Sequence, residues 1–526
     1  MEKKKKLIIL GVTILILAIS GITYAILTWT STKINLGLNS GCFTIDYTKG
    51  QDISGNLKLL NGAELSDGNG NFVIKEGMGL SYANLGIKSS CTIEGYGSLY
   101  LNVTTLSDSF KEGGDSNGAL GYALLRNTSN LSNDKLTIEN LKGQSFEMID
   151  AKPITNTGTI KLVTEQLSNT ELNKYLIVIF VISQAAGNSI TSATFQGNIS
   201  ADAEQGKYTF AKYITDLYSY SSKTTVTNNS INYEYDTTNN LMQDVGGNIR
   251  YYGSNPNNYI AFNCSDYANQ TSSTCETWRI IGAFDGKVKL IRSESIGKYS
   301  WDNKDTTTGA EEGDYGKNDW TDARLMKLLN PGYDSETIGG SLYYNAKSGT
   351  CYSGQNNATI TCNFNSTGIK NDITRGLISD TTYYLGGWSS NSVYSNQIYE
   401  YERGANVFSG RPTIWQGKIA LPYPSDYGYS ADLSKCTNQL GSYRNSTCTS
   451  NNWMKTILGT SNNGWLLTPS FFTSNSAWDV YSSGDAYSDY YSASNELGVV
   501  PVLYLNSELS IKSGTGSSSE PYQLDV

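Results

Sequence analysis

The residues best suited to chemistry lie in one stretch near the C-terminus, residues 474–495. Seven Ser, four Tyr, three Asp and two Asn fill 16 of its 22 positions. Tyr offers a large amphipathic ring at a low cost in conformational entropy, and Ser and Asn add adaptable hydrogen bonds, as in antibody contact surfaces. The composition predicts a ligand-binding face formed by Asn475, Trp478, Tyr481, Asp485, Tyr487, Asp489, Tyr490, Tyr491 and Asn495.

Plainer interpretations of the same stretch are open. It could be a polar hairpin whose Tyr side chains are solvated. A Trp in such a strand, here Trp478, is more often a core residue than a ligand contact. The prediction of a binding face therefore depends on which of these rings reach the surface.

Acidic residues could supply other chemistry. Two carboxylates can hydrolyse a glycoside, and several can ligate calcium. No EF-hand or other ordered ligand spacing accompanies the acids here, so we expect them to be solvated loop residues. The candidates are Glu311, Glu312, Asp314, Asp479, Asp485 and Asp489.

The chain of 526 residues has no His. Catalytic triads, Cys-His dyads and His-ligated zinc sites all require an imidazole, so these classes of enzyme are excluded. The 39 Lys and Arg against 48 Asp and Glu give a net charge of −9, which argues against nucleic acid as a partner. We expect a protein that is not an enzyme and carries no cofactor or metal.

Eight Cys residues favour an oxidising compartment. Six of them form three closely spaced pairs, and no C-x₂₋₄-C zinc knuckle is present. We predict local disulfides, with reduced buried thiols as the alternative. The predicted pairs are Cys264 with Cys275, Cys351 with Cys362, Cys436 with Cys448 and, from the two remaining residues, Cys42 with Cys91.

Residues 1–29 form a lysine cluster followed by an uncharged apolar run. The run is long enough to cross a membrane, and the positive-inside rule directs all that follows to the outside. Small residues at 23–25 also fit a signal-peptidase site. Residues 1–29 are therefore predicted to be an export signal, and the sequence leaves cleavage or retention as a membrane anchor open.

The aromatic residues divide the exported chain. Eight of nine Trp and 31 of 38 Tyr follow residue 205. We predict a β-sandwich at 30–205, a short helix and linker at 206–245, and an α+β domain at 246–526, which gives a mainly β fold with a smaller α+β part. Expected strands of the first domain are 43–47, 97–104, 159–163, 175–183 and 193–203.

In the last domain, Asp285-Gly286 predicts a hairpin turn between strands 278–284 and 287–291. The apolar spacing predicts a helix at 320–330 that starts at the N-cap candidate Thr321. The Ser/Asn-rich segment 388–401 is expected to be irregular.

Segments of the first half resemble the camelysin and TasA family of Gram-positive surface and fibre proteins. The segments are 23–29, 156–160, 186–190 and 193–203. The resemblance covers about a third of the chain and implies a jelly-roll sandwich, a surface location and, in some members, polymerisation through an N-terminal strand. The metalloprotease activity ascribed to camelysins is not carried over, because this chain has no His.

The second half is similar to an uncharacterised surface domain of gut Firmicutes, related to the formylglycine-generating-enzyme branch of the C-type lectin-like fold. Residues 474–495 also resemble the variable repeat of proteins diversified by retroelements, which precedes a fixed strand, here 499–505. The oxidase chemistry of the wider fold needs a reactive Cys pair, and the Cys residues here are better explained as local bridges. The resemblance is carried by segments 248–253, 278–282, 417–429, 465–469 and 498–504.

Two functions from different classes remain. The first is an adhesin-like protein that is displayed on a cell surface and binds a host, microbial or phage protein or glycan through the Tyr/Ser/Asp face. The second is a structural fibre or biofilm-matrix subunit that self-assembles through the first domain. Both place the protein outside a cell membrane or on the cell surface, most simply that of a Gram-positive bacterium.

Overall fold

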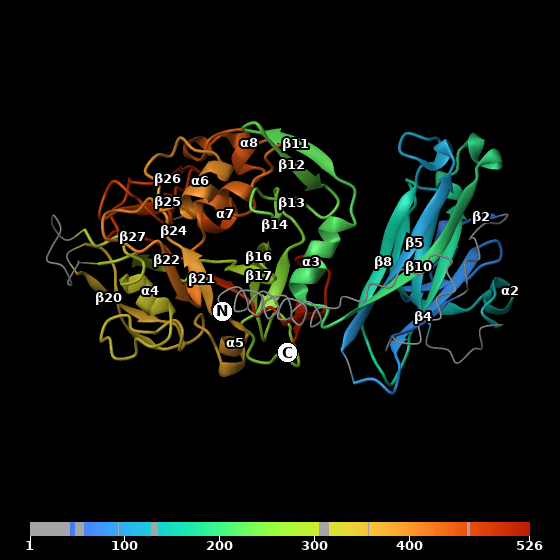
Figure 1. Cartoon of the computed structure of the whole chain (residues 1–526), viewed down its shortest axis with the longest axis horizontal. Coiled ribbons are helices and arrows are strands. Elements are labelled where there is room, and N and C mark those ends of the chain that lie inside the picture. The colour runs from blue at the N-terminus through green and yellow to red at the C-terminus, as the bar shows by residue number, and fades with distance from the viewer. Residues whose placement is uncertain are drawn as a thin grey trace, which may run out of the picture. The chain divides into compact units, whose positions relative to one another are not determined.

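The computed structural model describes residues 43–47, 57–92, 94–127, 135–303, 315–355, 357–459 and 463–526. The chain divides into two compact units, Met1–Tyr208 and Thr209–Val526. Strands outnumber helices in both (Figure 1). The fold is therefore mainly β, as predicted, and the division falls close to the residue at which the aromatic composition changes.

The first unit contains two sheets that share a core. Leu99 and Leu101 of one sheet pack with Ile177 and Ile179 of the other, so the two sheets face each other as a sandwich. One sheet has the order β1 (Phe43–Tyr47), β4 (Gly79–Ile87), β9 (Asn173–Ile182), β6 (Leu120–Arg126), β7 (Ser145–Pro153) and β3 (Asn71–Val73), with β2 (Leu59–Leu60) paired to β9. The other has the order β10 (Phe195–Gln205), β5 (Gly95–Leu106) and β8 (Gly158–Leu167).

Strand β9 is buried on both faces. Ile177 and Ile179 point into the core between the sheets, whereas Leu176 and Val178 pack with Phe72 in a second core on the opposite face. Helix α2 (Ile138–Leu141) contributes Leu141 to that second core. A run of apolar residues without alternation therefore correctly indicated a doubly buried strand.

The five predicted strands of this unit are confirmed as β1, β5, β8, β9 and β10. Strands β4, β6 and β7 were not predicted. Gly, Asn and charged residues interrupt their apolar pattern, so the sequence carries only a weak signal for them.

The second unit is built on a nine-stranded sheet. Its expected hairpin turn is confirmed, because Asp285 and Gly286 join β16 to β17 with φ values of 46° and 74°. The order is β11 (Thr224–Asn228), β12 (Ile231–Asp236), β13 (Leu241–Gln243), β14 (Ile249–Tyr251), β16 (Glu276–Phe284), β17 (Lys287–Arg292), β28 (Val502–Tyr504) and β23 (Ile419–Ala420), with β15 (Tyr259–Phe262) on β16.

The predicted linker within 206–245 is wrong. Its first part is helix α3 (Phe210–Ser219), which confirms the short helix. The Thr- and Asn-rich part that follows forms the β11–β12 hairpin at the end of the large sheet. Asn229 and Ser230 occupy its turn with φ values of 47° and 62°. Thr favours strands and Asn tolerates left-handed backbone, so the same residues that resemble a linker here build a hairpin.

A second, five-stranded sheet has the order β18 (Lys298–Ser300), β27 (Glu496–Gly498), β24 (Gly464–Pro469), β25 (Ala477–Val480) and β26 (Ala486–Tyr487). Three strand pairs complete the unit: β19 (Ser348–Tyr352) with β20 (Thr359–Asn363), β21 (Thr381–Tyr384) with β22 (Ile414–Gly417), and β29 (Ser510–Ser513) with β30 (Gln523–Asp525). Its other helices are α4 (Arg324–Leu329), α5 (Asp372–Leu377), α6 (Ser395–Glu402), α7 (Pro424–Tyr429), α8 (Ser446–Thr449) and α9 (Lys455–Leu458).

Helix α4 begins later than predicted. The Thr321 hydroxyl donates to Asp319 at 2.6 Å instead of capping a helix, and the Arg324 N–H at the actual start donates to Asp302 Oδ1 at 3.0 Å. A carboxylate from a distant segment thus fixes the helix start, which local sequence does not reveal. Helix α6 likewise occupies part of the segment that we expected to be irregular.

Three predicted disulfides are confirmed: Cys264–Cys275, Cys351–Cys362 and Cys436–Cys448. Cys91 is also disulfide-bonded, and its predicted partner Cys42 lies outside the described residues. Three bridges within one unit fit an oxidising compartment.

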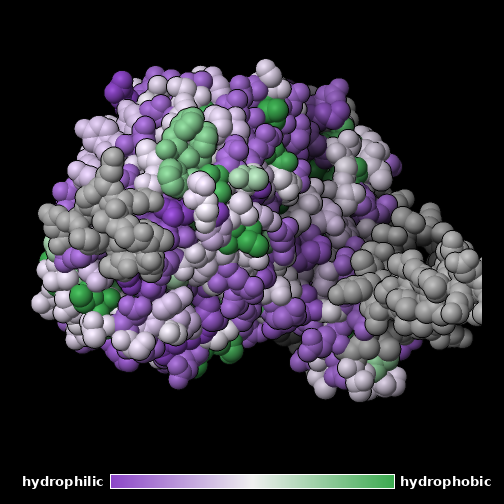
Figure 2. Space-filling model, turned by 60° about the vertical axis from the view of Figure 1, so that its left-hand side comes forward, coloured by the Kyte–Doolittle hydropathy of each residue, from purple (hydrophilic) through white to green (hydrophobic). Residues whose placement is uncertain are grey.

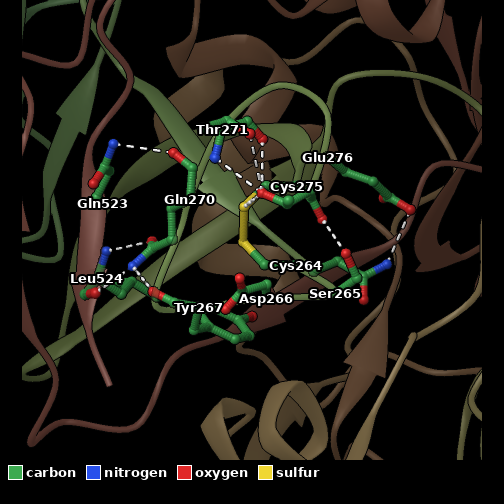
Figure 3. Close-up of a disulfide and its surroundings, with 12 residues drawn as sticks. Cys264, Ser265, Asp266, Tyr267, Gln270, Thr271, Cys275, Glu276, Gln523 and Leu524 are labelled. Carbon is green, nitrogen blue, oxygen red and sulfur yellow. Dashed lines mark hydrogen bonds between the residues drawn. A yellow bond between two sulfur atoms is a disulfide. The ribbon is translucent and has the colours of Figure 1, made fainter.

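The loop closed by Cys264 and Cys275 holds the C-terminal strand (Figure 3). Gln270 Nε2 in this loop donates to the Leu524 carbonyl at 2.7 Å, and the Leu524 N–H donates to Gln270 Oε1 at 2.9 Å. Gln523 Nε2 donates to the Gln270 carbonyl at 3.0 Å. The disulfide loop thereby anchors β30 to the domain.

A network of buried charges lies in the centre of the second unit. Asp426 receives Arg250 Nη1 at 2.8 Å and Lys289 Nζ at 2.5 Å, and Asp244 receives Arg250 Nε at 2.5 Å. All four side chains are buried. Each carboxylate thus has a cationic partner, as buried ions require.

Helices of the described residues are all too short or too polar to cross a bilayer. The span predicted at 1–29 lies outside those residues, so its prediction stands as made.

Candidate ligand-binding site

The predicted face is built on the five-stranded sheet. Residues 474–495 run through β25, a turn at 481–485, β26 and the irregular segment 488–491 (Figure 1). In the same sheet β24 lies beside β25, and β27 lies on the other side of β24. In the ladder Asp479 pairs with Tyr487 and Val480 with Ala486, and an isolated bridge joins Ser476 to Ser492. The scaffold therefore brings both halves of the stretch together.

Four predicted Tyr side chains form one group, which we term the tyrosine cluster: Tyr481, Tyr487, Tyr490 and Tyr491. The centroid of the Tyr481 ring lies 5.0 Å from those of Tyr487 and Tyr490 and 5.7 Å from that of Tyr491. Tyr490 is 65% exposed, and the other three are half-buried. The structure thus gathers these rings at the surface around Tyr481.

The turn beneath the cluster is held from several sides. The Tyr481 N–H donates to the Asp485 carbonyl at 2.8 Å, and the Tyr427 hydroxyl donates to the Gly484 carbonyl at 2.6 Å. Gly484 has a φ of 109° and lies against Thr449, so a side chain at this position would meet both backbone strain and a clash. These contacts pre-organise the turn.

Asn463 is a site residue that the sequence did not indicate. Its Nδ2 donates to the Tyr491 hydroxyl at 3.0 Å, and its Oδ1 accepts the Ser482 N–H at 2.9 Å. It lies just before β24, far from the predicted stretch in the chain, so only the sheet topology places it beside the cluster.

Trp478 does not belong to the exposed face, and its predicted contact role is wrong. The side chain is fully buried, and its Nε1 donates to the Trp388 carbonyl at 2.8 Å. Successive side chains of strand β25 point to opposite faces of the sheet, so Trp478 lies on the face opposite to that of Asp479 and Tyr487. The core interpretation left open above is the correct one.

Asn475 and Asn495 are half-buried and stabilise turns. Asn495 Oδ1 accepts the Ser492 N–H at 3.0 Å, and the Asn475 carbonyl accepts the Ala493 N–H at 2.7 Å. The Asn475–Ala493 contact joins the two ends of the stretch, and Asn475 Oδ1 accepts the Ser476 hydroxyl at 3.3 Å.

Asp485 is buried rather than solvated, which corrects the expectation. Its Oδ1 accepts the Arg444 N–H at 2.8 Å, and its Oδ2 accepts the Tyr487 hydroxyl at 3.3 Å and lies 3.7 Å from Arg444 Nη1. Asp485 therefore positions Tyr487 instead of presenting itself to a ligand.

Asp479 also contradicts the expectation of a solvated loop acid. It sits within β25, its side chain is 0% exposed, and neither carboxyl oxygen has a hydrogen-bond partner among the described residues. Burial, and then the nearby charge of Asp489, raise the pKa of Asp479 well above its ordinary value. Only Asp489 lies exposed as expected, while Glu311, Glu312 and Asp314 fall outside the described residues.

The chemistry of the cluster is that of neutral hydroxyls. Burial, and then Asp485, raise the pKa of Tyr487 above its usual value, and burial does the same for Tyr481. These phenols thus stay protonated at neutral pH and offer donors, acceptors and ring faces. No group of three or more acids or Cys in the described part of the chain could hold a metal ion.

A second aromatic surface adjoins the start of the stretch. The rings of Trp388 and Tyr401 stack with centroids 3.8 Å apart, Phe471 lies 5.5 Å from Trp388, and Phe472 follows at 4.1 Å from Phe471. Ser389 Oγ accepts the N–H groups of both Phe residues at 3.0 Å. Phe472 is 72% exposed, and the sequence analysis did not single it out.

Comparison with known proteins adds no relative. No model of a known protein family matches the chain, and no curated protein is similar to it in sequence.

Proposed function

We propose that the protein is a non-enzymatic, surface-displayed binding protein whose tyrosine cluster contacts the ligand. The observation that carries the proposal is the gathering of four Tyr rings from the turn, β26 and segment 488–491 around one exposed position, Tyr490. Tyr is enriched among the residues that dominate binding energy, because it buries much area and keeps a polar tip.

The support under the cluster strengthens the proposal. The turn at 481–485 is held by Tyr427, by the Arg444 N–H and by Asn463, and Cys436–Cys448 closes the loop that contains Arg444. A rigid binding surface loses less conformational entropy when the ligand binds, and pre-organisation raises affinity in this way.

One face of the molecule, that of Figure 2, is mainly hydrophilic. In the view of Figure 2, hydrophobic atoms form small separate groups on a mainly hydrophilic face. A ligand would therefore be recognised by aromatic area combined with hydrogen bonds rather than by a broad apolar patch. Host, microbial or phage proteins and glycans all fit this chemistry, and a C-type lectin-like scaffold would present it in the same way.

Replacing Tyr490 by Ala in the full chain tests the proposal, with the half-exposed Tyr220 on another element replaced by Ala as the control. We expect capture of a ligand from a glycan and host-protein array to fall about 30-fold or more for Tyr490→Ala, since hot-spot residues contribute about 2 kcal/mol or more. Tyr220→Ala should bind as the unaltered chain does. Equal capture by all three proteins would overturn the proposal.

The second candidate is the structural subunit. In the three-stranded sheet of the sandwich, β10 and β8 each pair with β5 alone among the described strands, so each has an edge that could accept a strand from another copy. Deleting residues 30–36 should then stop polymer growth in an electron-microscopy assay while leaving the monomer folded. Normal fibres after the deletion would dismiss this route of assembly.

Both candidates share the proposed location. Export through residues 1–29 to the outer face of a Gram-positive membrane agrees with the disulfides of the second unit.

A further inference from the structure

We infer that Asp479 is the acidic centre of a site that takes a Lys or Arg side chain of a peptide or protein ligand through the tyrosine cluster, and that its carboxyl group releases its proton to solvent when the cation binds. This inference rests on the proposed function, because it names the class of ligand for the same face. It starts from a carboxyl group for which the fold provides no partner.

The lack of a partner sets Asp479 apart within its own domain. Asp426 is equally buried and receives Arg250 and Lys289, and Asp485 is buried and receives the Arg444 N–H and the Tyr487 hydroxyl. Among the described residues, Asp479 is the only carboxyl group with buried oxygens that accept no hydrogen bond. An unpaired buried carboxyl group destabilises the fold, and the buried acids Asp426 and Asp485 both have partners. The missing partner of Asp479 is therefore explained most simply by a ligand that supplies it.

The carboxyl group faces the tyrosine cluster. Asp479 and Tyr487 are directly opposed in the antiparallel ladder, and opposed side chains emerge on the same face of a sheet. Tyr481 and Tyr487 both lie near enough to Asp479 for its ionisation to raise their pKa values, and Asp489 lies near enough to raise the pKa of Asp479. Asp479 thus lies on the face of the sheet from which Tyr487 of the tyrosine cluster emerges.

The missing partner has a positive charge. The charged group that acts on Asp479 is another acid, Asp489, whereas Arg444, which lowers the pKa of Tyr487, pairs with Asp485. Two acids and four electron-rich rings form an environment that attracts a cation, because ring faces and carboxylates both stabilise ammonium and guanidinium groups.

An organic cation fits better than a metal ion. Calcium takes six to eight oxygen ligands, and the described residues supply no group of three acids here. A Lys or Arg side chain needs fewer contacts, and its alkyl stem would lie against the Tyr rings.

Segment 488–491 provides the way in. It lies between the Asp479–Tyr487 pair and the Ser476–Ser492 bridge. Its four residues face only Ala477 and Trp478 of β25, and none of the four belongs to a strand. Moving it breaks no ladder. The first residue of the segment, Ser488, has a buried hydroxyl without a hydrogen-bond partner among the described residues. This hydroxyl offers a further polar contact to the incoming Lys or Arg side chain.

Isothermal titration of the full chain with three capped tripeptides tests this inference. The peptides have the form Gly-X-Gly, where X is Lys, Arg or Nε-acetyl-Lys. We expect saturable binding of the Lys or Arg peptide and binding about tenfold weaker or undetectable for the acetylated one, which lacks the charge. No saturable binding of either cationic peptide overturns the inference.

Asp479→Asn keeps the shape of the side chain and removes the carboxyl group that must ionise to pair with a cation, and Asp380→Asn removes an exposed charge elsewhere. Asp479→Asn should weaken binding of the cationic peptide about tenfold or more, while Asp380→Asn leaves it unchanged. The Asp479→Asn variant should also unfold at the same or a higher temperature at pH 7, which a purely structural acid would not allow. Unchanged peptide binding by Asp479→Asn, or a lower unfolding temperature with binding retained, overturns the inference.

The experiments distinguish failure of the proposed binding role of the tyrosine cluster from failure of the cation site at Asp479. If Tyr490→Ala loses array capture and no cationic peptide binds, the face binds a ligand of another class and only the present inference is wrong. If a cationic peptide binds in an Asp479-dependent way but Tyr490→Ala captures ligands normally, the cation site stands and the proposed role of the cluster fails.

Discussion

Asp426 and Asp479 are two buried acids of one domain in opposite circumstances. Asp426, in the core beside the nine-stranded sheet, holds two cations and accepts the Tyr423 N–H at 2.9 Å. Asp479, in the five-stranded sheet, accepts no hydrogen bond from the described residues. The contrast separates a carboxylate that the fold uses for its own stability from one that it leaves for an external partner.

The largest effect is expected from Asp426→Ala. The substitution leaves Arg250 and Lys289 buried without their anion, and breaking a buried ion pair in this way costs about 3–5 kcal/mol. Urea unfolding followed by Trp fluorescence reports on the second unit, because eight of the nine Trp residues lie in it. A loss below about 1 kcal/mol would show that the network is dispensable and would remove the contrast with Asp479.

Asp479→Asn should act in the opposite direction, with a gain of about 1–3 kcal/mol in the free energy of unfolding at pH 7. Because the pKa of Asp479 is raised in the folded state, the folded chain keeps a proton that the unfolded chain has lost. Stability is therefore full below about pH 4 and declines as the pH rises towards the folded pKa, and Asn removes this decline. Urea titrations at pH 5 and pH 8 should show the larger gain at pH 8, and a loss at both would contradict the expectation.

Asp302 is an intermediate case, with N–H donors in place of cations. It accepts the Lys317 and Arg324 N–H groups at 2.9 and 3.0 Å, yet burial raises its pKa to about 7. The contribution of Asp302 to the free energy of unfolding is complete below its ordinary pKa of 3.8. It falls as the pH rises to 7, by at most about 1.4 kcal/mol per pH unit. Asp302→Asn should thus flatten the pH dependence of unfolding between pH 4 and 7, at a cost of about 1–2 kcal/mol at pH 4 for the lost acceptor. An unchanged slope would contradict this.

The smallest effect is expected from Arg444→Ala. Its side chain is 69% exposed and lies 3.7 Å from Asp485, and exposed ion pairs contribute about 0–1 kcal/mol. Asp485 keeps the backbone N–H of residue 444 and the Tyr487 hydroxyl. A loss above about 2 kcal/mol in the same urea assay would show that Asp485 depends on its cation as Asp426 does.

Local patterns predicted much of the fold. Alternation and turn residues indicated the β16–β17 hairpin and five strands of the sandwich, and short Cys spacing indicated three disulfides. These features depend on residues close together in the chain, so the sequence carries their signal. The linker and the N-cap of α4 were mispredicted, because their partners are a neighbouring strand and the distant Asp302.

The site was predicted only in its aromatic part. Composition singled out the Tyr residues of 474–495, and the structure brings four of them together. Composition could not separate the buried Trp478 from the exposed Tyr490, nor indicate that Asn463 would reach Tyr491 from another strand. Side-chain direction depends on register and on what covers each face, which are set by strands distant in the chain.

By itself, the sequence determined that the chain has no imidazole chemistry, that six of its Cys residues pair locally, and that Tyr, Ser and Asp are concentrated near the C-terminus, because these are properties of composition and short spacing. Only the tertiary structure decided which of those acids have partners. Asp479, Asp485 and Asp489 look alike in the chain, yet one is buried alone, one is buried with donors and one is exposed. The difference arises because a carboxyl group is stabilised by whatever the fold places beside it.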